Sequence, residues 1–159
     1  MAGELDPLIA ADVVRGTVRL LVRHDWLAMG EVPLGNGRRA DLMALCPKGS
    51  ITIIEVKTSR ADLLGDAKWP DYLDCCDRYF WAVPQGFDLS LFDRPALMPH
   101  RAGLIVADRY DAVMVRVAVD TPLASARRKA ETLRFARCAA RRLLFGAEGD
   151  GHYPVQTDL

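Results

Sequence analysis

The sequence lacks an excess of one charge and any long apolar run. Lys plus Arg and Asp plus Glu each number 21 in 159 residues, so the net charge is zero. Nucleic-acid binding would therefore require a local basic patch rather than an overall positive field. No apolar run approaches the ~18 residues needed to span a membrane. The N-terminus also lacks the apolar segment of a signal peptide, so we expect neither a membrane anchor nor export.

Cysteine is scarce and forms no C-x-x-C pair or zinc-ligand spacing. We expect all four cysteines to be reduced packing residues, which favours a cytoplasmic location. Half of the residues are hydrophobic and about a quarter are charged, as in an ordinary globular protein. We predict one domain at residues 1–146, followed by a flexible C-terminal tail at 147–159.

What is present centres on residues 51–56, whose β-branched residues predict a central strand buried on both faces. Glu55 lies near the C-terminal end of this strand, and Lys57 follows it. Because side chains alternate along a strand, both charges share a face with Ile51 and Ile53. A buried charge costs roughly several kcal/mol unless it is paired or binds a metal. This strand end is therefore the first candidate for a functional site.

A further acid, Asp41, lies in the preceding apolar run. If that run forms a hairpin with the central strand so that Leu45 faces Ile51, Asp41 falls opposite Glu55. Facing carboxylates repel each other, and Lys57 or a divalent cation would relieve the repulsion. Carboxylates and carbonyls are hard oxygen ligands suited to Mg²⁺ or Mn²⁺. A register shift of one residue would instead turn Asp41 to the other face.

The motif of Asp41 followed by Glu55-x-Lys57, with Ala40 before the first acid, stands in a wider pattern. Its other parts are Glu31-Val-Pro-Leu-Gly, Thr58-Ser-Arg-Ala-Asp62, Asp66-Ala-Lys68-Trp69-Pro70-Asp-Tyr72, Cys76-Asp77-Arg78 and Gly103-Leu-Ile-Val-Ala-Asp108. The pattern resembles the MmcB family of DNA-repair endonucleases, in the PD-(D/E)XK nuclease superfamily, where a proline takes the place of Ala40. The short motif alone is weakly specific, but the resemblance extends over about residues 8–145.

The resemblance implies an α/β fold with a restriction-endonuclease-like core, in which helices flank a mixed central β-sheet. It also implies a metal-dependent endonuclease that hydrolyses DNA phosphodiester bonds in repair. Asp41, Glu55 and the Val56 carbonyl would bind Mg²⁺ or Mn²⁺, and Lys57 would act beside the attacking water. DNA is the expected partner. A homodimer would suit this activity, because cleavage of two strands by a nuclease with one site requires two sites, but the sequence does not give the oligomeric state.

Two other interpretations stay open. The chain could be a catalytically inactive nuclease-fold module that binds DNA or a partner, or Glu55 and Lys57 could form a buried ion pair in a scaffold. Nucleases of this superfamily often take an additional acid from the first helix, which offers only Asp12 and Asp25 here. Glu31 could serve as the extra metal ligand or be an exposed edge residue.

The segment after the central strand holds further candidates. Ser59 and Arg60 would begin a helix whose N-terminal amides could contact phosphate. Lys68 is either a surface charge or, as the resemblance implies, a polar residue placed over the site. Trp69 is expected to fill the core.

The last predicted helix, residues 125–145, carries seven Lys or Arg and one acid, Glu131. A solvated face is one interpretation of this basic run, and contact of Arg134, Arg137 and Arg141 with phosphates is the other. Its expected inner face is apolar, formed by Ala126, Ala130, Leu133, Ala136 or Arg137, Ala140 and Leu144.

Capping and turn signals define the remaining elements. We predict a helix at 7–25 starting from Asp6-Pro7, an edge strand at 31–35, a two-residue Asn36-Gly37 turn, and strands at 38–45 and 51–56. Two short helical pieces between 59 and 76, a parallel strand at 78–83, a loop at 84–101 with one helical turn, and strands at 103–107 and 112–119 then lead to the last helix.

Overall fold

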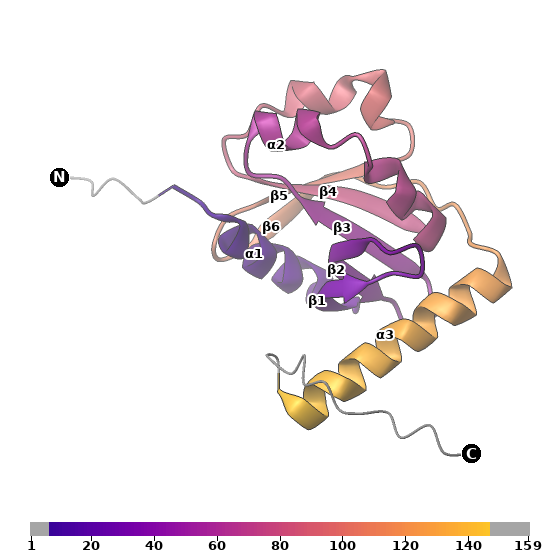
Figure 1. Cartoon of the computed structure of the whole chain (residues 1–159). Helices are drawn as coiled ribbons and strands as arrows, with labels where there is room; N and C mark the ends of the chain where they lie inside the picture. The colour runs from indigo at the N-terminus through magenta and orange to yellow at the C-terminus, as the bar shows by residue number, and fades with distance from the viewer. Residues whose placement is uncertain (1–6, 147–159) are drawn as a thin grey trace, which may run out of the picture.

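The computed structural model describes residues 7–146 as an α/β fold built on one mixed sheet of six strands (Figure 1). The strands follow one another across the sheet in chain order, and β3, β4 and β5 run parallel while the other neighbours pair antiparallel. The predicted fold class is thereby confirmed. The strands are β1 (Leu27–Pro33), β2 (Arg39–Leu45), β3 (Ile51–Val56), β4 (Arg78–Pro84), β5 (Gly103–Ala107) and β6 (Ala112–Arg116).

Different helices cover the two faces of the sheet. The helix α1 (Ala10–Arg23) packs Val13, Leu20 and Leu21 into the core on one face. The other face is covered by α2 (Arg60–Gly65) and three 3₁₀ helices, η1 (Trp69–Cys75), η2 (Leu89–Asp93) and η3 (Pro95–Leu97). The last helix, α3 (Ser125–Phe145), lies along the β1 edge (Figure 1). Across residues 7–146, none of the helices has the length and apolar character to cross a membrane.

The strand register is the one that the sequence predicts. Leu45 of β2 faces Ile51 of β3, and the pairing continues to Leu42 and Ile54. Ile51 and Ile53 belong to the core on the α2 face, whereas Ile54 belongs to the core under α1. Since side chains alternate, Glu55 points to the same face as Ile51 and Ile53.

Several predicted boundaries are wrong by a few residues. The first strand is Leu27–Pro33 rather than residues 31–35. Helix α1 begins at Ala10 rather than residue 7, because the side chain of Asp12 accepts a hydrogen bond from the backbone N–H of Ile9. The first hairpin has a three-residue loop, since Leu34 N–H donates to Arg38 O over 2.8 Å. The strand β6 ends at Arg116 instead of residue 119, following a register shift against β5. The predicted tail lies outside the described residues.

The predicted apolar inner face of α3 is also wrong. Leu133 and Leu144 on that face are 58% and 75% exposed. Within the described part of α3, the fully buried side chain is that of Glu131, which accepts a hydrogen bond from Gly35 N–H, and Phe135 packs partly against the core. Helix α3 therefore packs against the rest of the protein through both polar and apolar side chains, those of Glu131 and Phe135.

The buried carboxylate of Asp77 joins the start of α3 to the sheet. It accepts hydrogen bonds from Ile51 N–H at 2.7 Å and Leu123 N–H at 2.8 Å, and it pairs with Arg128. Burial tends to raise the pKa of Asp77, but these donors outweigh it and hold the pKa below its usual value. Asp77, directly before β4, thus fixes the position of α3.

Candidate active site

Asp41 and Glu55 come together where the β2–β3 ladder ends. The backbone N–H of Asp41 donates to Glu55 Oε1 at 2.9 Å, and that of Val56 donates to Asp41 Oδ2 at 2.8 Å. Each carboxylate therefore accepts a backbone hydrogen bond from the neighbouring strand. These reciprocal bonds hold the two acids beside each other, as the hairpin register predicts.

The pair carries negative charge that its surroundings do not fully balance. Burial and the charge of Asp41 raise the pKa of Glu55 to about 8, against the hydrogen bond from Asp41 N–H and the charge of Lys57. Burial also raises the pKa of Asp41, although the Val56 N–H and Lys57 oppose this. Such a site favours either a proton or a cation.

Lys57 lies beside this pair but is held by other acids. Its Nζ lies 2.8 Å from Asp66 Oδ2 and 3.5 Å from Asp62 Oδ1, and the side chain is 8% exposed. Burial disfavours the ammonium, but the hydrogen bond to Asp66 and the nearby acidic charges outweigh it and raise the pKa of Lys57. The alternative of a Glu55–Lys57 ion pair is therefore wrong: the contact partner is Asp66.

The roles of Asp62 and Asp66 were missed in the sequence. One signal for them exists: the two acids are four residues apart, hence on one side of the helical segment that follows the central strand. The segment that follows the central strand crosses back over the end of that strand. Acids on the inner side of this segment can therefore reach Lys57. Both acids occur in the wider sequence pattern, which gives neither of them a role.

Glu31 stands opposite Asp41 in the β1–β2 register, between the pairs Gly30–Leu42 and Val32–Ala40. Its backbone has a φ of 52°. The side chain is 58% exposed and forms an ion pair with Arg39 at 2.6 Å. The charge of Glu31 contributes to the raised pKa of Asp41. A role for Glu31 as a metal ligand stays a prediction.

The first helix brings no acid to the pair. Helix α1 covers the opposite face of the sheet from Ile51 and Ile53. Asp12 accepts a hydrogen bond at the start of that helix, and Asp25 lies beyond its end with a φ of 57°.

Ser59, Arg60 and Lys68 are exposed residues around the site. Ser59 Oγ accepts a hydrogen bond from Asp62 N–H, so it already caps the six-residue helix α2. Ser59 and Arg60 line an open hollow of about 480 Å³ at the carboxyl ends of β3 and β4. Lys68 donates its backbone N–H to Asp66 Oδ1, while Trp69 is buried as expected. Phosphate contacts by these side chains stay predictions.

Two carboxylates and one carbonyl form the available metal donor set. Within residues 7–146, no group of three or more His, Cys, Asp or Glu side chains gathers as a metal site. The second oxygens of Asp41 and Glu55, Oδ1 and Oε2, accept no hydrogen bond from any described residue. Hard oxygen atoms and negative charge are the chemistry that Mg²⁺ or Mn²⁺ prefers, so these residues fit such an ion, and its binding here stays a prediction.

The open mixed sheet, flanked by helices and ending in an acid pair, defines an α/β protein with a nuclease-like core. The chain belongs to the family described as DNA repair protein MmcB-like, whose model matches residues 6–149. This confirms the family inferred from the sequence and assigns the chain a role in DNA repair.

One solved structure also matches over nearly the whole chain. It is described as the SPO1766 protein of unknown function from Silicibacter pomeroyi, with 43% sequence identity and a TM-score of 0.79. The match covers 96% of this chain and 99% of that one. No curated protein matches the sequence.

Proposed function

We propose that this protein is a metal-dependent endonuclease that hydrolyses DNA phosphodiester bonds during repair. The observation that carries the proposal is the meeting of half-buried Asp41 with buried Glu55, each carboxylate held by a backbone N–H of the neighbouring strand. The raised pKa of both acids supports it, because a cation would stabilise the ionised pair.

In this proposal Asp41, Glu55 and the Val56 carbonyl hold Mg²⁺ or Mn²⁺. Such an ion, when bound, would polarise a phosphate oxygen and lower the pKa of water. The chain itself supplies fixed geometry, because each carboxylate is held by a backbone N–H. Burial of the Glu55 and Lys57 side chains also strengthens their electrostatic interactions with a charged phosphate.

Lys57 is the proposed cation beside the reacting phosphate. Its raised pKa keeps it an ammonium at neutral pH, so it would stabilise developing negative charge rather than accept a proton. Asp66 and Asp62 limit where the ammonium can lie. We therefore assign Asp66 a positioning role that acts through Lys57.

Two measurements test this function. The first is cleavage of plasmid and branched DNA with Mg²⁺ or Mn²⁺ by wild type, Asp41→Ala and Lys57→Ala. We expect both substitutions to lower the rate by at least about a hundredfold, as for loss of an electrostatic catalytic group. Asp74→Asn is the matched control, since Asp74 is an exposed acid outside the pair.

The second measurement is calorimetric titration of Mn²⁺ into wild type and Glu55→Gln. The variant keeps an oxygen for Asp41 N–H but loses a charge, so we expect much weaker binding. Cleavage that persists unchanged in both Asp41→Ala and Lys57→Ala would refute the catalytic proposal. Equal Mn²⁺ binding by Glu55→Gln would refute the metal site.

The second candidate is a nuclease-fold module that binds DNA without cleaving it. The ion pair of Lys57 with Asp66 favours this candidate, because it already occupies the ammonium. DNA binding that needs no metal, with no cleavage of plasmid, branched or nicked substrates, would support it over the enzyme.

A further inference from the structure

The charge of this neutral chain is strongly divided between α3 and the rest. Helix α3 holds seven of the 21 basic residues and one of the 21 acids, which leaves fourteen basic and twenty acidic residues elsewhere. A local basic surface of this kind attracts polyanions although the net charge is zero.

Structural contacts account for part of this charge. Arg128 pairs with Asp77, Arg142 donates to the carbonyls of Gly30 and Glu31, and Arg127 and Arg134 lie 3.7 and 3.8 Å from Glu131. Within residues 7–146, no hydrogen bond or ion pair engages the side chains of Lys129, Arg137 or Arg141. Among the described residues, these three cations are therefore uncommitted.

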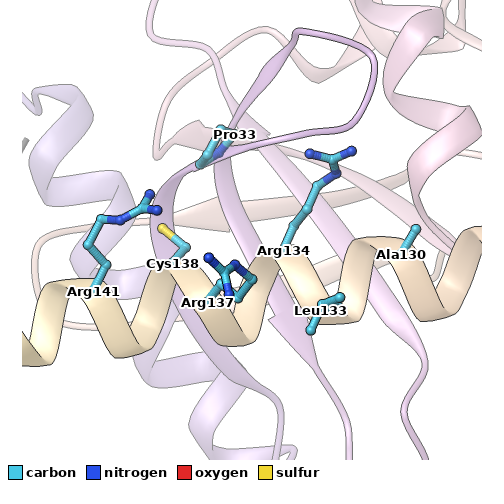
Figure 2. Close-up of a pocket in the computed structure, with 7 residues that line it drawn as sticks. All are labelled: Pro33, Ala130, Leu133, Arg134, Arg137, Cys138 and Arg141. Atoms are coloured by element: carbon cyan, nitrogen blue, oxygen red, sulfur yellow. The ribbon is translucent and has the colours of Figure 1, made fainter. Parts of the chain in front are cut away.

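Two of the uncommitted cations border a groove between α3 and the end of β1. The groove has a volume of about 380 Å³ and is lined by Pro33, Leu133, Arg134, Arg137, Cys138 and Arg141. Figure 2 shows the Arg134 and Arg141 side chains rising on either side of Cys138 towards the Pro33 side. Exposed Leu133 and Pro33 add apolar surface to the groove.

The spacing of the arginines fits a nucleic-acid strand. Positions 134, 137 and 141 lie on one side of the helix and span about 10 Å along its axis. A DNA strand rises about 3.4 Å per nucleotide, so this length corresponds to roughly three phosphates. Guanidinium groups also match phosphate oxygens in geometry.

The groove lies one strand away from the acid pair. Arg142, next to Arg141, binds the carbonyl of Glu31, and Glu31 stands opposite Asp41 in the sheet register. A polyanion in the groove would therefore run beside the strand that borders the proposed site. The acid pair repels phosphate when no metal is bound, whereas the groove attracts it.

We propose that the α3 groove binds the phosphate backbone of duplex DNA, as an anchor separate from the acid pair. The inference rests on the proposed function for the identity of DNA as ligand, but it requires neither a metal nor cleavage. The anchor reads no sequence, because phosphate contacts carry none. Arg137 and Arg141 are its main contacts. Arg134 also contributes, because its ion pair with Glu131 is long, at 3.8 Å, and can be exchanged for a contact with phosphate.

The test is binding of a fluorescent DNA duplex to the full chain in EDTA, measured by anisotropy over a series of salt concentrations. We expect Arg137→Ala and Arg141→Ala each to weaken binding and to reduce the slope of log K against log salt by about one. Arg15→Ala is the matched control, since exposed Arg15 lies on α1 at the opposite face of the sheet. It should leave both the affinity and the slope unchanged.

Alkylation of Cys138, followed by mass spectrometry, locates the bound duplex. Cys138 lines the groove and is partly exposed, and partly exposed Cys46 at the β2–β3 turn is the internal reference. We expect duplex DNA to slow alkylation of Cys138 much more than that of Cys46. Equal slowing of the two thiols would overturn the inference.

Other outcomes also decide the matter. Wild-type affinity and slope in both arginine variants would overturn the inference, as would tighter binding of RNA or of anionic vesicles than of duplex DNA. The proposed function and the anchor can fail separately, because they are measured by different readouts. Asp41→Ala should lose cleavage but still bind duplex DNA in EDTA. Loss of DNA binding in the arginine variants of a protein that never cleaves DNA would support the anchor alone.

Discussion

The acid pair and helix α3 hold their charges in opposite ways. Glu55 and Lys57 are buried and Asp41 is half-buried, and each forms a hydrogen bond that fixes its position. Arg137 and Arg141 are exposed, and no described residue pairs with them. The first arrangement suits chemistry, which needs groups fixed before the substrate arrives. The second suits binding of a polyanion, which tolerates mobile side chains.

A buried carboxylate is one of the connections between the two regions. Asp77 joins Arg128 of α3 to the backbone of Ile51, the first residue of the strand that carries Glu55. The comparison therefore predicts large effects for buried charges and small ones for exposed charges.

The largest expected effect is that of Asp77→Ala, which would break the link between the two regions. It leaves the Ile51 and Leu123 N–H groups without their acceptor, so we expect a loss on the order of 3 kcal/mol of unfolding free energy. Urea denaturation measures this loss. Asp120→Ala is the control, because its exposed pair with Arg78 spans 3.4 Å and should contribute less than about 1 kcal/mol. Similar losses in both variants would contradict the proposed link.

Glu55→Gln would sharpen the comparison through pH. The folded-state pKa of Glu55 is about 8 against 4.5 as its ordinary value, so the folded protein binds more protons between these values. Stability of the metal-free chain should therefore fall as pH rises from about 5 to 8. Glu55→Gln removes this penalty, and we expect it to be more stable than wild type at pH 8 by on the order of 2 kcal/mol.

Thermal unfolding in EDTA at pH 5 and pH 8 measures the effect of Glu55→Gln. The advantage of the variant should shrink at pH 5, where Glu55 of the folded wild type is protonated. A difference that does not depend on pH would contradict the raised pKa. Excess Mn²⁺ should stabilise wild type but not the variant, because a ligand that binds the folded state stabilises it.

Asp66→Asn should lower the free energy of unfolding by a smaller amount, because it removes one partner of Lys57 beside the acid pair. Lys57 would lose its closest partner and keep only Asp62 at 3.5 Å. We expect a loss of about 1 kcal/mol at pH 7, between the values for exposed and buried pairs. The raised pKa of Lys57 means that this stabilisation is present below its ordinary value of 10.5 and is lost as pH rises through the folded-state pKa.

Asp62→Asn is the matched control for Asp66→Asn. The carboxylate of Asp62 is 49% exposed and lies farther from Lys57, so its loss should cost less than about 0.5 kcal/mol. Urea denaturation of both variants at pH 7 measures the difference. A larger loss in Asp62→Asn would reverse our assignment of the main partner.

Most of the sheet could be predicted because its signals are local. The β-branched run at residues 51–56 forms a strand whose side chains alternate between two cores. The five-residue loop before it fixes the register, which brings Asp41 to Glu55. Ser125 and Gly146 mark the ends of α3, and Gly146 takes the positive φ of 81° that suits glycine.

The attachment of α3 could not be predicted in the same way. Its apolar periodicity indicates a buried face, yet Leu133 is 58% exposed and Glu131 is fully buried. Glu131 and Arg128 of α3 bind Gly35 and Asp77, which are distant in sequence. Gly35 lies in the loop of the first hairpin, and Asp77 directly precedes β4. Periodicity reports which residues are apolar, but not which partners a polar residue will meet.

The sequence by itself determined the family, the strand register and the meeting of two acids, because alternation along paired strands follows from covalent geometry. The tertiary structure alone decided that Lys57 is held by Asp66 and Asp62, and that Arg137 and Arg141 have no partner among the described residues while Arg128 pairs with buried Asp77. These outcomes depend on packing between distant segments. Packing assigns each charge its neighbours, and the neighbours decide whether that charge is fixed or available.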